Sequence, residues 1–366
     1  MKAFIMAAGY GTRLEPLTIA VPKPLVPIVN KPSMLHNIEL LHFYGFREIT
    51  ANIHYHPEQI QNYFGDGNEF GVQLRYSYEE ELMGTAGGVW RMGKVINDVQ
   101  DTFVVMSSDA ITDINLSKIV DFHKKKKALV TIGLAPVEDP SEFGVVITDA
   151  DSKISAFQEK PKKGKALSNM VNAGIYVMEP EVLDMIPANT FYDFGKQLFP
   201  KLAEGKDEIY GYKMTEYWSD VGNLSQYRTA NTDAMTDKVK LRIPGKRSAK
   251  NMWLSRGSKV LDKAGISGAA VVGVSSHIGK NVKITGHTVI GGLCIIEDGA
   301  ELHNTIVWPN VYIGKNTRVE DSIIGAWCHL DSNVTVGKGT VISNRCRVRN
   351  NTNIPAGTKI SPDAIV

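Results

Sequence analysis

The sequence predicts two structural parts: an α/β domain with a mostly parallel sheet in the first two thirds and a parallel β-helix in the last third. Three observations carry this prediction. Strand-like segments alternate with helical ones, a glycine-rich turn follows the first strand, and an aliphatic residue recurs every six positions from Leu254 onward. The predicted boundaries are residues 1–236 for the α/β domain, 237–253 for a polar linker and 254–366 for the repeat.

Composition, charge and cysteine content narrow the class of protein. The chain has 366 residues, of which 43% are hydrophobic and 22% charged, ordinary values for a globular protein. A net charge of +2 argues against a nucleic-acid binder, and no apolar run approaches the ~18 residues that span a bilayer. Three cysteines cannot form a disulfide framework and fit a reducing compartment. We therefore expect a cytoplasmic enzyme or scaffold that binds neither nucleic acid nor membranes.

The first two thirds alternate strand-like and helix-like segments. Apolar and β-branched stretches predict strands at residues 2–6, 48–53, 103–106, 128–134, 144–148 and 172–178. Helical spacing of apolar residues predicts a helix at 34–44, and the lysine run at 124–127 is interpreted as a solvated helix end. This alternation indicates a sheet covered by helices, in which ligands bind at the carboxyl ends of the strands.

The last third carries a six-residue repeat. Nineteen aliphatic positions are joined by sixteen steps of six residues and two steps of five. They are Leu254, Val260, Ile266, Val272, Ile278, Ile284, Ile290, Ile296, Leu302, Val307, Ile313, Val319, Ile324, Leu330, Val336, Ile342, Val348, Ile354 and Ile360. A chain that turns a corner every six residues buries one bulky side chain per unit, which predicts a parallel β-helix of about six turns with three units per turn.

A second periodic position explains the cysteines. The fourth residue after each aliphatic position is small or aliphatic, never charged or aromatic, and Cys294, Cys328 and Cys346 all occupy it. Metal ligation or a redox pair is the alternative, but no Cys-x-x-Cys spacing supports it. The cysteines are therefore interpreted as small buried hydrophobic residues.

A glycine-rich loop follows the first predicted strand directly. Gly9 and Gly11 leave backbone N–H groups open to an anion, and Arg13 and Lys23 add two cations. A Walker A loop is excluded because its motif does not occur, and a dinucleotide fingerprint would need glycine where Leu14 stands. A tight turn without a ligand is a further alternative, but it explains neither cation. The loop is therefore interpreted as a phosphate-binding site.

This loop and six later segments together resemble the signature of the nucleotide-sugar pyrophosphorylases, or sugar-1-phosphate nucleotidyltransferases. The pattern Gly-x-Gly-Thr-Arg-Leu-x-Pro-Leu-Thr, followed by Pro-Lys-Pro, fills residues 9–24. Further matches follow in order at residues 84–87, 108–109, 143–146, 159–161, 172–176 and 218–222. The resemblance covers the whole chain, because many members carry a C-terminal hexapeptide β-helix. It implies a Rossmann-like, three-layer nucleotidyltransferase domain and a left-handed sense for the β-helix.

The resemblance implies a reaction in which an oxygen of a sugar 1-phosphate attacks the α-phosphorus of a nucleoside triphosphate and pyrophosphate leaves. No covalent protein intermediate is needed, so catalysis consists of positioning and charge neutralisation. Mg²⁺ is the expected cofactor, since it needs only one or two carboxylates besides substrate phosphates. Asp109 and Asp220 are the expected metal ligands, although either could be a capping aspartate, and Asp113 is expected to be structural.

The family pattern also implies roles for the other motif residues. Arg13 and Lys23 complete the expected catalytic set with Asp109 and Asp220. The expected nucleotide-binding residues are Ala7, Ala8, Gly9, Gly11, Thr12, Gly84 and Thr85, and the expected sugar-phosphate-binding residues are Gly144, Glu159, Lys160 and Asn172. Glu159 and Lys160 could instead form a surface ion pair. Phe143 departs from the pattern, in which tyrosine is frequent.

Residues 79–86 and 171–174 look most like mannose-1-phosphate guanylyltransferases, so GTP and mannose 1-phosphate are the expected substrates and GDP-mannose the expected product. UTP, dTTP or ATP with glucose 1-phosphate stay open as alternatives. Two rival functions are an acyltransferase activity of the β-helix, with His277, His287, His303 or His329 as base, and a non-catalytic regulatory homologue. Against the acyltransferase activity, none of these histidines has an evident partner residue for an acyl site. Against the regulatory homologue, such a protein would have lost charged residues of the motifs. Stacked coils with flat ends favour a homo-oligomer, either a dimer or a tetramer.

Overall fold

The computed structural model describes residues 1–97, 99–205, 207–248, 251–261 and 264–366. These residues form two compact units. The first contains Met1–Tyr10 and Met34–Asp220, and the second contains Gly11–Ser33 and Val221–Val366. The segment that carries Arg13 and Lys23 therefore groups with the C-terminal part of the chain. The boundaries predicted at residues 236 and 253 stay predictions.

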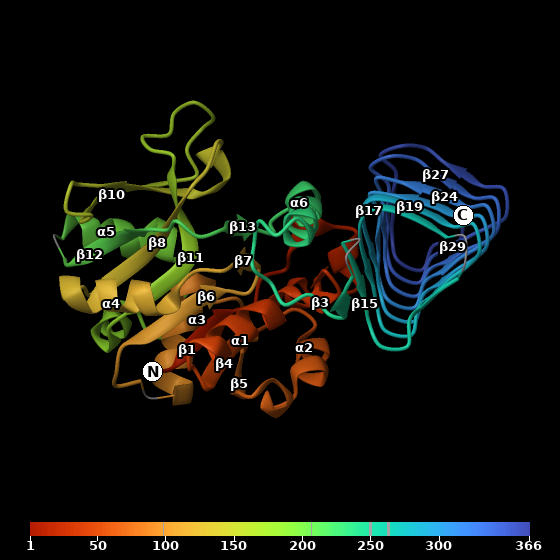
Figure 1. Cartoon of the computed structure of the whole chain (residues 1–366). Coiled ribbons are helices and arrows are strands. Elements are labelled where there is room, and N and C mark those ends of the chain that lie inside the picture. Colours follow the sequence, from red (N-terminus) through yellow and green to blue (C-terminus); the bar gives the residue numbers. More distant parts are fainter. Residues whose placement is uncertain (98, 206, 249–250, 262–263) are drawn as a thin grey trace. The chain divides into compact units, whose positions relative to one another are not determined.

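The first unit contains a mixed sheet with the strand order β10-β9-β11-β6-β1-β4-β5 (Figure 1). Its strands are β1 (Ala3–Met6), β4 (Glu48–Ile53), β5 (Gln73–Tyr78), β6 (Phe103–Ser107), β8 (Val130–Pro136), β9 (Gly144–Thr148), β10 (Ile154–Glu159), β11 (Met170–Met178) and β12 (Ile209–Lys213). The adjacent strands β6, β1, β4 and β5 run parallel, whereas β11 runs antiparallel to both β6 and β8. All six predicted strands are confirmed to within two residues at each end.

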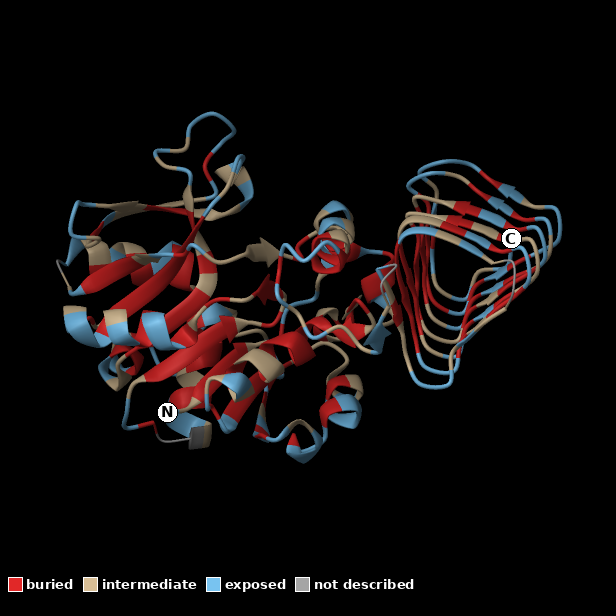
Figure 2. Ribbon diagram, viewed as in Figure 1, coloured by how far each residue is buried: buried red, intermediate tan, exposed pale blue. Residues whose placement is uncertain are grey.

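Helices pack on this sheet and close its core. They are α1 (Ser33–Phe43), α2 (Pro57–Phe64), α3 (Gly84–Trp90), α4 (Leu116–Lys126) and α5 (Phe199–Glu204). Phe4 and Phe103 of the sheet lie in one buried cluster with Val89 of α3 and Phe199 of α5, and Figure 2 shows the central strands buried along their length. Helix α4 ends in the lysine run, which confirms that interpretation. No helix in the described ranges has the length and apolar character that crossing a membrane requires.

The second unit contains helix α6 (Leu224–Met235) and a coil of parallel strands. These strands are β15 (Met252–Leu254), β16 (Lys259–Val260), β17 (Gly265–Val272), β18 (His277–Ile278), β19 (Lys283–Ile290), β20 (Ile295–Ile296), β21 (Glu301–His303), β22 (Ile306–Val307), β23 (Tyr312–Ile313), β24 (Arg318–Glu320), β25 (Ile323–Ile324), β26 (His329–Leu330), β27 (Thr335–Val336), β28 (Val341–Ile342), β29 (Arg347–Val348), β30 (Asn353–Ile354) and β31 (Lys359–Ile360). Ile284 pairs with Leu302 one turn later, and Leu302 pairs with Val319. One turn thus equals three repeat units, as predicted, and a five-residue step shortens a turn by one residue.

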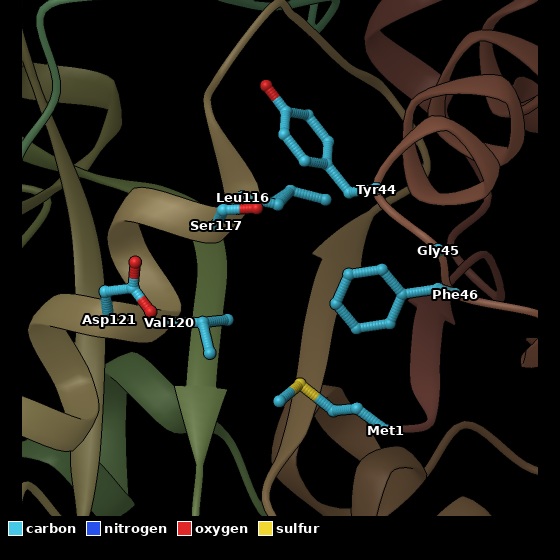
Figure 3. Close-up of a pocket in the computed structure, with 8 residues that line it drawn as sticks. All are labelled: Met1, Tyr44, Gly45, Phe46, Leu116, Ser117, Val120 and Asp121. Atoms are coloured by element: carbon cyan, nitrogen blue, oxygen red, sulfur yellow. The ribbon is translucent and has the colours of Figure 1, made fainter.

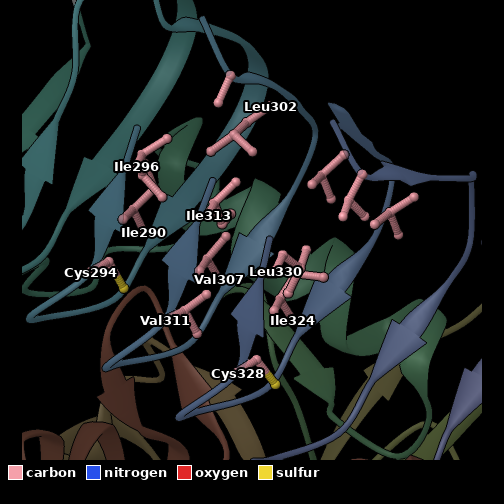
Figure 4. Close-up of a cluster of buried hydrophobic side chains, with 14 of the residues drawn as sticks. Ile290, Cys294, Ile296, Leu302, Val307, Val311, Ile313, Ile324, Cys328 and Leu330 are labelled. Atoms are coloured by element: carbon pink, nitrogen blue, oxygen red, sulfur yellow. The ribbon is translucent and has the colours of Figure 1, made fainter. Parts of the chain in front are cut away.

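The repeated aliphatic side chains fill the inside of the coil (Figure 4). Cys294, Cys328 and Cys346 are buried among them, which confirms their interpretation as small core residues. Burial raises the pKa of the Cys294 thiol to about 11, so the thiolate is disfavoured at neutral pH. Corners of the coil need left-handed backbone, which asparagine tolerates, and Asn316 and Asn333 adopt φ values of 57° and 59° there.

Candidate functional site

Within the second unit, the signature loop folds tightly around Gly11. This glycine has φ 71° and precedes a short 3-10 helix, η1 (Thr12–Leu14), which contains Arg13. A Cβ atom on Gly11 would lie 2.9 Å from Cβ of Lys23, and the Thr18 hydroxyl donates to the Gly11 carbonyl at 2.9 Å. Only glycine combines this backbone conformation with such a close approach. The structure therefore brings Gly11 and the expected catalytic Lys23 together.

Two side-chain hydrogen bonds join this loop segment to the β-helix. The Ser343 hydroxyl, which is buried, donates to the Pro16 carbonyl at 2.7 Å, three residues after Arg13. Farther along the segment, Nδ2 of Asn30 donates to the Ile290 carbonyl at 2.8 Å. A hydrogen bond to a buried carbonyl contributes about 0.5–1.5 kcal/mol to the conformation in which it forms. The β-helix thus restrains the conformation of the loop.

Helix α6 holds the same segment. The Val29 N–H donates to Oδ1 of Asn231 at 2.8 Å, and the Tyr227 hydroxyl donates to the Pro27 carbonyl at 2.9 Å. Nε1 of Trp308, on the β-helix, donates to the Tyr227 hydroxyl at 2.9 Å. Tyr227 is fully buried, so α6 connects the loop segment and the coil through a satisfied polar network. Sequence reasoning missed Tyr227, Asn231 and Ser343.

In the first unit, the two expected metal ligands lie at neighbouring strand ends. Asp109 follows β6, and its Oδ1 accepts a hydrogen bond from the Ser107 hydroxyl at 2.5 Å. Strand β13 (Trp218–Asp220) runs antiparallel to β7 (Ala110–Thr112) and places Asp220 opposite Ala110, the residue after Asp109. Oδ1 of Asp113 accepts from the Tyr217 N–H at 3.0 Å and ties the same two strands together, as expected of a structural residue.

This pair of carboxylates suits Mg²⁺. In the described ranges, no group of three or more histidine, cysteine and carboxylate side chains is arranged to hold a metal. A metal that relies on protein ligands alone therefore has no site there. Mg²⁺ keeps several waters and takes one or two carboxylates together with substrate phosphates. Asp109 and Asp220 are two carboxylates, the number that such a site would need.

A buried polar network supports the first expected nucleotide-binding residues. The Ala7 N–H donates to Oδ1 of Asn52 at 2.7 Å, and Nδ2 of Asn52 donates to the buried Glu79 carboxylate at 2.7 Å. The other Glu79 oxygen accepts from the Met83 N–H at 2.9 Å. Because its N–H is engaged, Ala7 has only its carbonyl and methyl group for a nucleotide. Sequence reasoning missed Asn52 and Glu79, although a polar residue in an apolar strand was a signal for Asn52.

The expected residues Gly84 and Thr85 begin α3 and contact a distant loop. Gly84 has φ 73°, and a Cβ atom there would lie 2.6 Å from the Tyr192 carbonyl oxygen. The Thr85 hydroxyl donates to Asp193 at 3.1 Å and accepts from the Phe194 N–H at 2.9 Å. These bonds fix the first turn of α3. They also engage the Thr85 hydroxyl, and sequence reasoning missed Asp193.

Glu159 lies beside two glycines. It pairs with Gly144 across β9 and β10, and its carboxylate oxygen would lie 2.5 Å from a Cβ atom on Gly195. Burial raises the pKa of Glu159, Asp193 adds to the rise, and Lys160 and Lys196 oppose it. Among the described residues no hydrogen bond or close ion pair joins Glu159 and Lys160, although the positive charge of Lys160 favours the ionised carboxylate. The absence of a side chain at Gly144 and Gly195 lets the half-buried Glu159 carboxylate pack directly against their backbone.

Asn172 is fixed where β11 changes partners. Its Oδ1 accepts from the Gly174 N–H at 2.9 Å, and its Nδ2 donates to the Tyr176 hydroxyl at 3.0 Å. The ladder with β8 shifts register between Asn172 and Tyr176, an irregularity typical of functional edges. An amide side chain has two donor hydrogens and two acceptor lone pairs. Asn172 therefore keeps one of each for a ligand.

Phe143, which stands where the signature frequently has tyrosine, packs against another aromatic ring. The Phe143 and Trp218 rings meet edge to face with centroids 5.6 Å apart, and Nε1 of Trp218 donates to the Ala173 carbonyl at 2.9 Å. Such an aromatic pair contributes about 0.5–1.5 kcal/mol beyond its buried area. Phe143 thus supports β13 without a hydroxyl.

Two other features involve none of the expected nucleotide- or sugar-binding residues. On the β-helix, the His303 ring contacts Thr285 and Asn304, and Nε2 of His329 lies 3.0 Å from Oδ1 of Asp331. A cavity of about 180 Å³ near Tyr44, Phe46 and Val120 is lined mainly by apolar side chains and by none of the expected site residues (Figure 3).

Comparison with known proteins relates both parts of the chain to known families. A family model described as "Nucleotidyl transferase" matches residues 2–237, and one described as "EIF2B subunit epsilon LbH domain", a left-handed β-helix, matches residues 249–354. A UTP–glucose-1-phosphate uridylyltransferase from Synechocystis is 38% identical over 344 residues, covering 90% of this chain and 88% of the relative. Mannose-1-phosphate guanylyltransferase 1 of Arabidopsis thaliana is 31% identical over 353 residues, covering 94% of this chain and 93% of the relative.

Among solved structures, a Bacillus anthracis protein provisionally assigned as a glucose-1-phosphate thymidylyltransferase, in complex with sucrose, has a TM-score of 0.56. It is 25% identical, and the match covers 63% of this chain and 94% of that protein. The similarity extends over the α/β fold, in keeping with the share of the chain that it covers.

Proposed function

This chain belongs to the nucleotidyl transferase family, and from that premise we propose that it makes GDP-mannose and pyrophosphate from GTP and mannose 1-phosphate. Its reaction class is sugar-1-phosphate nucleotidyl transfer. The observation that carries the proposal is the pair Asp109 and Asp220 at adjoining strand ends in a chain whose signature loop presents Arg13 and Lys23. An oxygen of the sugar phosphate attacks the α-phosphorus, and pyrophosphate leaves in line.

In the proposed site, the signature loop binds the phosphates of the nucleotide. Arg13 presents a permanently charged fork that binds the β- and γ-phosphates, and Lys23 contacts the phosphates near the reacting centre. Gly9, Gly11 and Thr12 shape the loop, whereas Ala7, Ala8, Gly84 and Thr85 line the base and ribose site. Asp109 and Asp220 would hold Mg²⁺, which would neutralise charge on the phosphates. Positioning and charge neutralisation then lower the barrier without a covalent intermediate.

The proposed binding residues for the sugar 1-phosphate lie on or next to β9, β10 and β11. Lys160 binds the phosphate of the sugar, Glu159 and Asn172 hydrogen-bond its hydroxyls, and Gly144 contributes a backbone contact. Two features support these roles: the glycines beside the Glu159 carboxylate and the free donor and acceptor of Asn172. A site with these polar groups rejects a sugar that leaves them unpaired.

A second candidate pairs UTP with glucose 1-phosphate. The Synechocystis uridylyltransferase, at 38% identity over most of both chains, favours it. The mannose-specific relatives match as fully in length, and residues 79–86 and 171–174 favour mannose and guanine. We further propose that the protein is a homo-oligomer.

A pyrophosphate-release matrix tests the reaction and both substrate choices. GTP, UTP, dTTP and ATP are each combined with mannose 1-phosphate, glucose 1-phosphate and N-acetylglucosamine 1-phosphate, with and without Mg²⁺. We expect the highest kcat/KM for GTP with mannose 1-phosphate in the presence of Mg²⁺. A maximum at UTP with glucose 1-phosphate establishes the second candidate, and no pyrophosphate in any combination refutes the reaction class.

A further inference from the structure

A polar cavity in the second unit is lined by none of the residues expected to act in catalysis. It has a volume of about 400 Å³ and is lined by α6 and by three successive turns of the β-helix. We call it the α6 cavity and define it by Arg228 and Asn231 of α6 and His287, Asn304 and Asp321 of the coil. Its size falls within the range of small-molecule sites.

Two opposite charges line the α6 cavity and act on each other only through their electrostatic fields. The half-buried Arg228 guanidinium makes no hydrogen bond or ion pair within the described part of the chain, and neither does the Asp321 carboxylate. Burial lowers the pKa of Arg228, although the negative charge of Asp321 acts in the opposite direction. Lys238 differs, because it pairs with Asp233 at 2.8 Å. A half-buried arginine without a partner is costly unless a ligand supplies one.

The geometry points to a binding site for a small sugar or polyol that carries one phosphate group, with the phosphate on Arg228 and hydroxyls on Asp321. An arginine fork matches phosphate oxygens, and a carboxylate accepts hydrogen bonds from hydroxyl groups. Inorganic phosphate lacks the several hydroxyl groups that a sugar offers Asp321, and a bisphosphate adds a second anion to a cavity that already holds that carboxylate. Arg228 and Asp321 together therefore favour a molecule with one anionic group and several hydroxyls.

The α6 cavity adjoins the anchor of the signature loop. Asn231 lines the cavity, and its Oδ1 accepts the hydrogen bond from the Val29 N–H at 2.8 Å. Its Nδ2 donates to the Tyr227 carbonyl at 2.9 Å within α6. A ligand that orders this part of α6 also orders residues 11–33, because the two share Asn231. Occupancy is therefore expected to slow hydrogen exchange at Val29.

Isothermal titration of glucose 6-phosphate into the full chain, without nucleotide, tests the site. This probe is not a sugar 1-phosphate and so is not a substrate of the proposed reaction. We expect saturable binding that weakens about 10-fold or more in Arg228→Gln and in Asp321→Asn, as when a charge-assisted hydrogen bond is lost. Arg242→Gln, a matched change at an exposed arginine of the same unit, leaves binding unchanged. Binding also survives Lys160→Gln, which separates this site from the proposed sugar-phosphate site.

Hydrogen exchange of peptides covering residues 23–33 is the second readout, and it slows with the probe in the parent chain but not in Arg228→Gln. Thermal unfolding of each variant shows that the fold is intact, and Arg228→Lys replaces Arg228→Gln if the latter unfolds. The proposal is overturned if the probe does not bind, if binding is lost in Lys160→Gln and kept in Arg228→Gln, or if inorganic phosphate binds equally well.

Discussion

At the scale of single residues, the proposed reaction depends most on Asp109 and Asp220, the proposed Mg²⁺ ligands. Replacing either with asparagine keeps its size and removes the charge that binds a divalent cation. We expect Asp109→Asn and Asp220→Asn each to lower kcat at least ~100-fold, as when stabilisation of transition-state charge is lost. Steady-state pyrophosphate release measures the effect. Asp184→Asn is the control, because that aspartate pairs with Lys94 on the surface. Normal turnover in both active-site variants contradicts the metal assignment.

The Glu159 side chain couples stability to pH. Because burial raises its pKa above the unfolded value, ionisation of Glu159 costs stability once the pH rises through that range. We expect Glu159→Gln to have a higher Tm than the parent at about pH 7.5, and the difference to vanish near about pH 4. Its KM for the sugar 1-phosphate should rise, since a hydroxyl acceptor is lost.

Glu208 supplies a control of opposite sign for that measurement. Hydrogen bonds from Lys153 and Tyr210 lower the pKa of this exposed carboxylate, so its contribution is present above the unfolded value and lost as the pH falls. Glu208→Gln therefore gives no gain in Tm at neutral pH. A lower Tm for Glu159→Gln across the whole pH range contradicts the burial explanation.

At the scale of elements, the hydrogen bond between Ser343 and Pro16 links the β-helix to the loop that carries Arg13. Ser343→Ala removes the hydroxyl that donates to the buried Pro16 carbonyl, a loss of roughly 0.5–1.5 kcal/mol. We expect kcat to fall severalfold while the Tm changes by only a few degrees. Ser361→Ala, an exposed serine of the same coil, is the matched control and keeps normal turnover. An unchanged kcat in Ser343→Ala shows that the β-helix does not restrain the loop.

The sequence predicts those elements that a pattern within one stretch of the chain determines. The coil is predicted in register because each six-residue unit repeats the same burial requirement, and even the five-residue steps reappear as shortened turns. The ends of strands such as Glu48–Ile53 are predicted correctly because the apolar run stops at polar residues. Gly11 is predicted from its motif, and its left-handed φ explains why glycine stands there.

Contacts between distant residues escape such reasoning. Ser343 and Pro16 are separated by 327 positions, and neither belongs to a periodic pattern that indicates the other. Asn52 and Glu79 meet only because β4 and β5 pair in parallel, with Asn52 beside Ser77. A single polar residue gives no periodic signal, so the network beneath Ala7 became visible only in three dimensions.

At the scale of the whole molecule, we expect association of identical chains. Trp327 and Leu293 are 64% and 57% exposed on the β-helix, and we expect an interface between identical chains to cover these large apolar side chains. Light scattering is expected to give the mass of a dimer or tetramer, and Trp327→Ser to shift it toward the monomer. A parent chain that is monomeric at all concentrations contradicts the expectation.

The most direct test of the proposed reaction follows the phosphorus atoms of the nucleotide. The purified chain is incubated with Mg²⁺, mannose 1-phosphate and GTP labelled in either its α- or its γ-phosphate. We predict that the α-label appears in GDP-mannose and the γ-label in pyrophosphate. Release of either label as inorganic phosphate, or an α-label that never enters a nucleotide sugar with any of the sugar 1-phosphates and nucleotides of the matrix, contradicts the account.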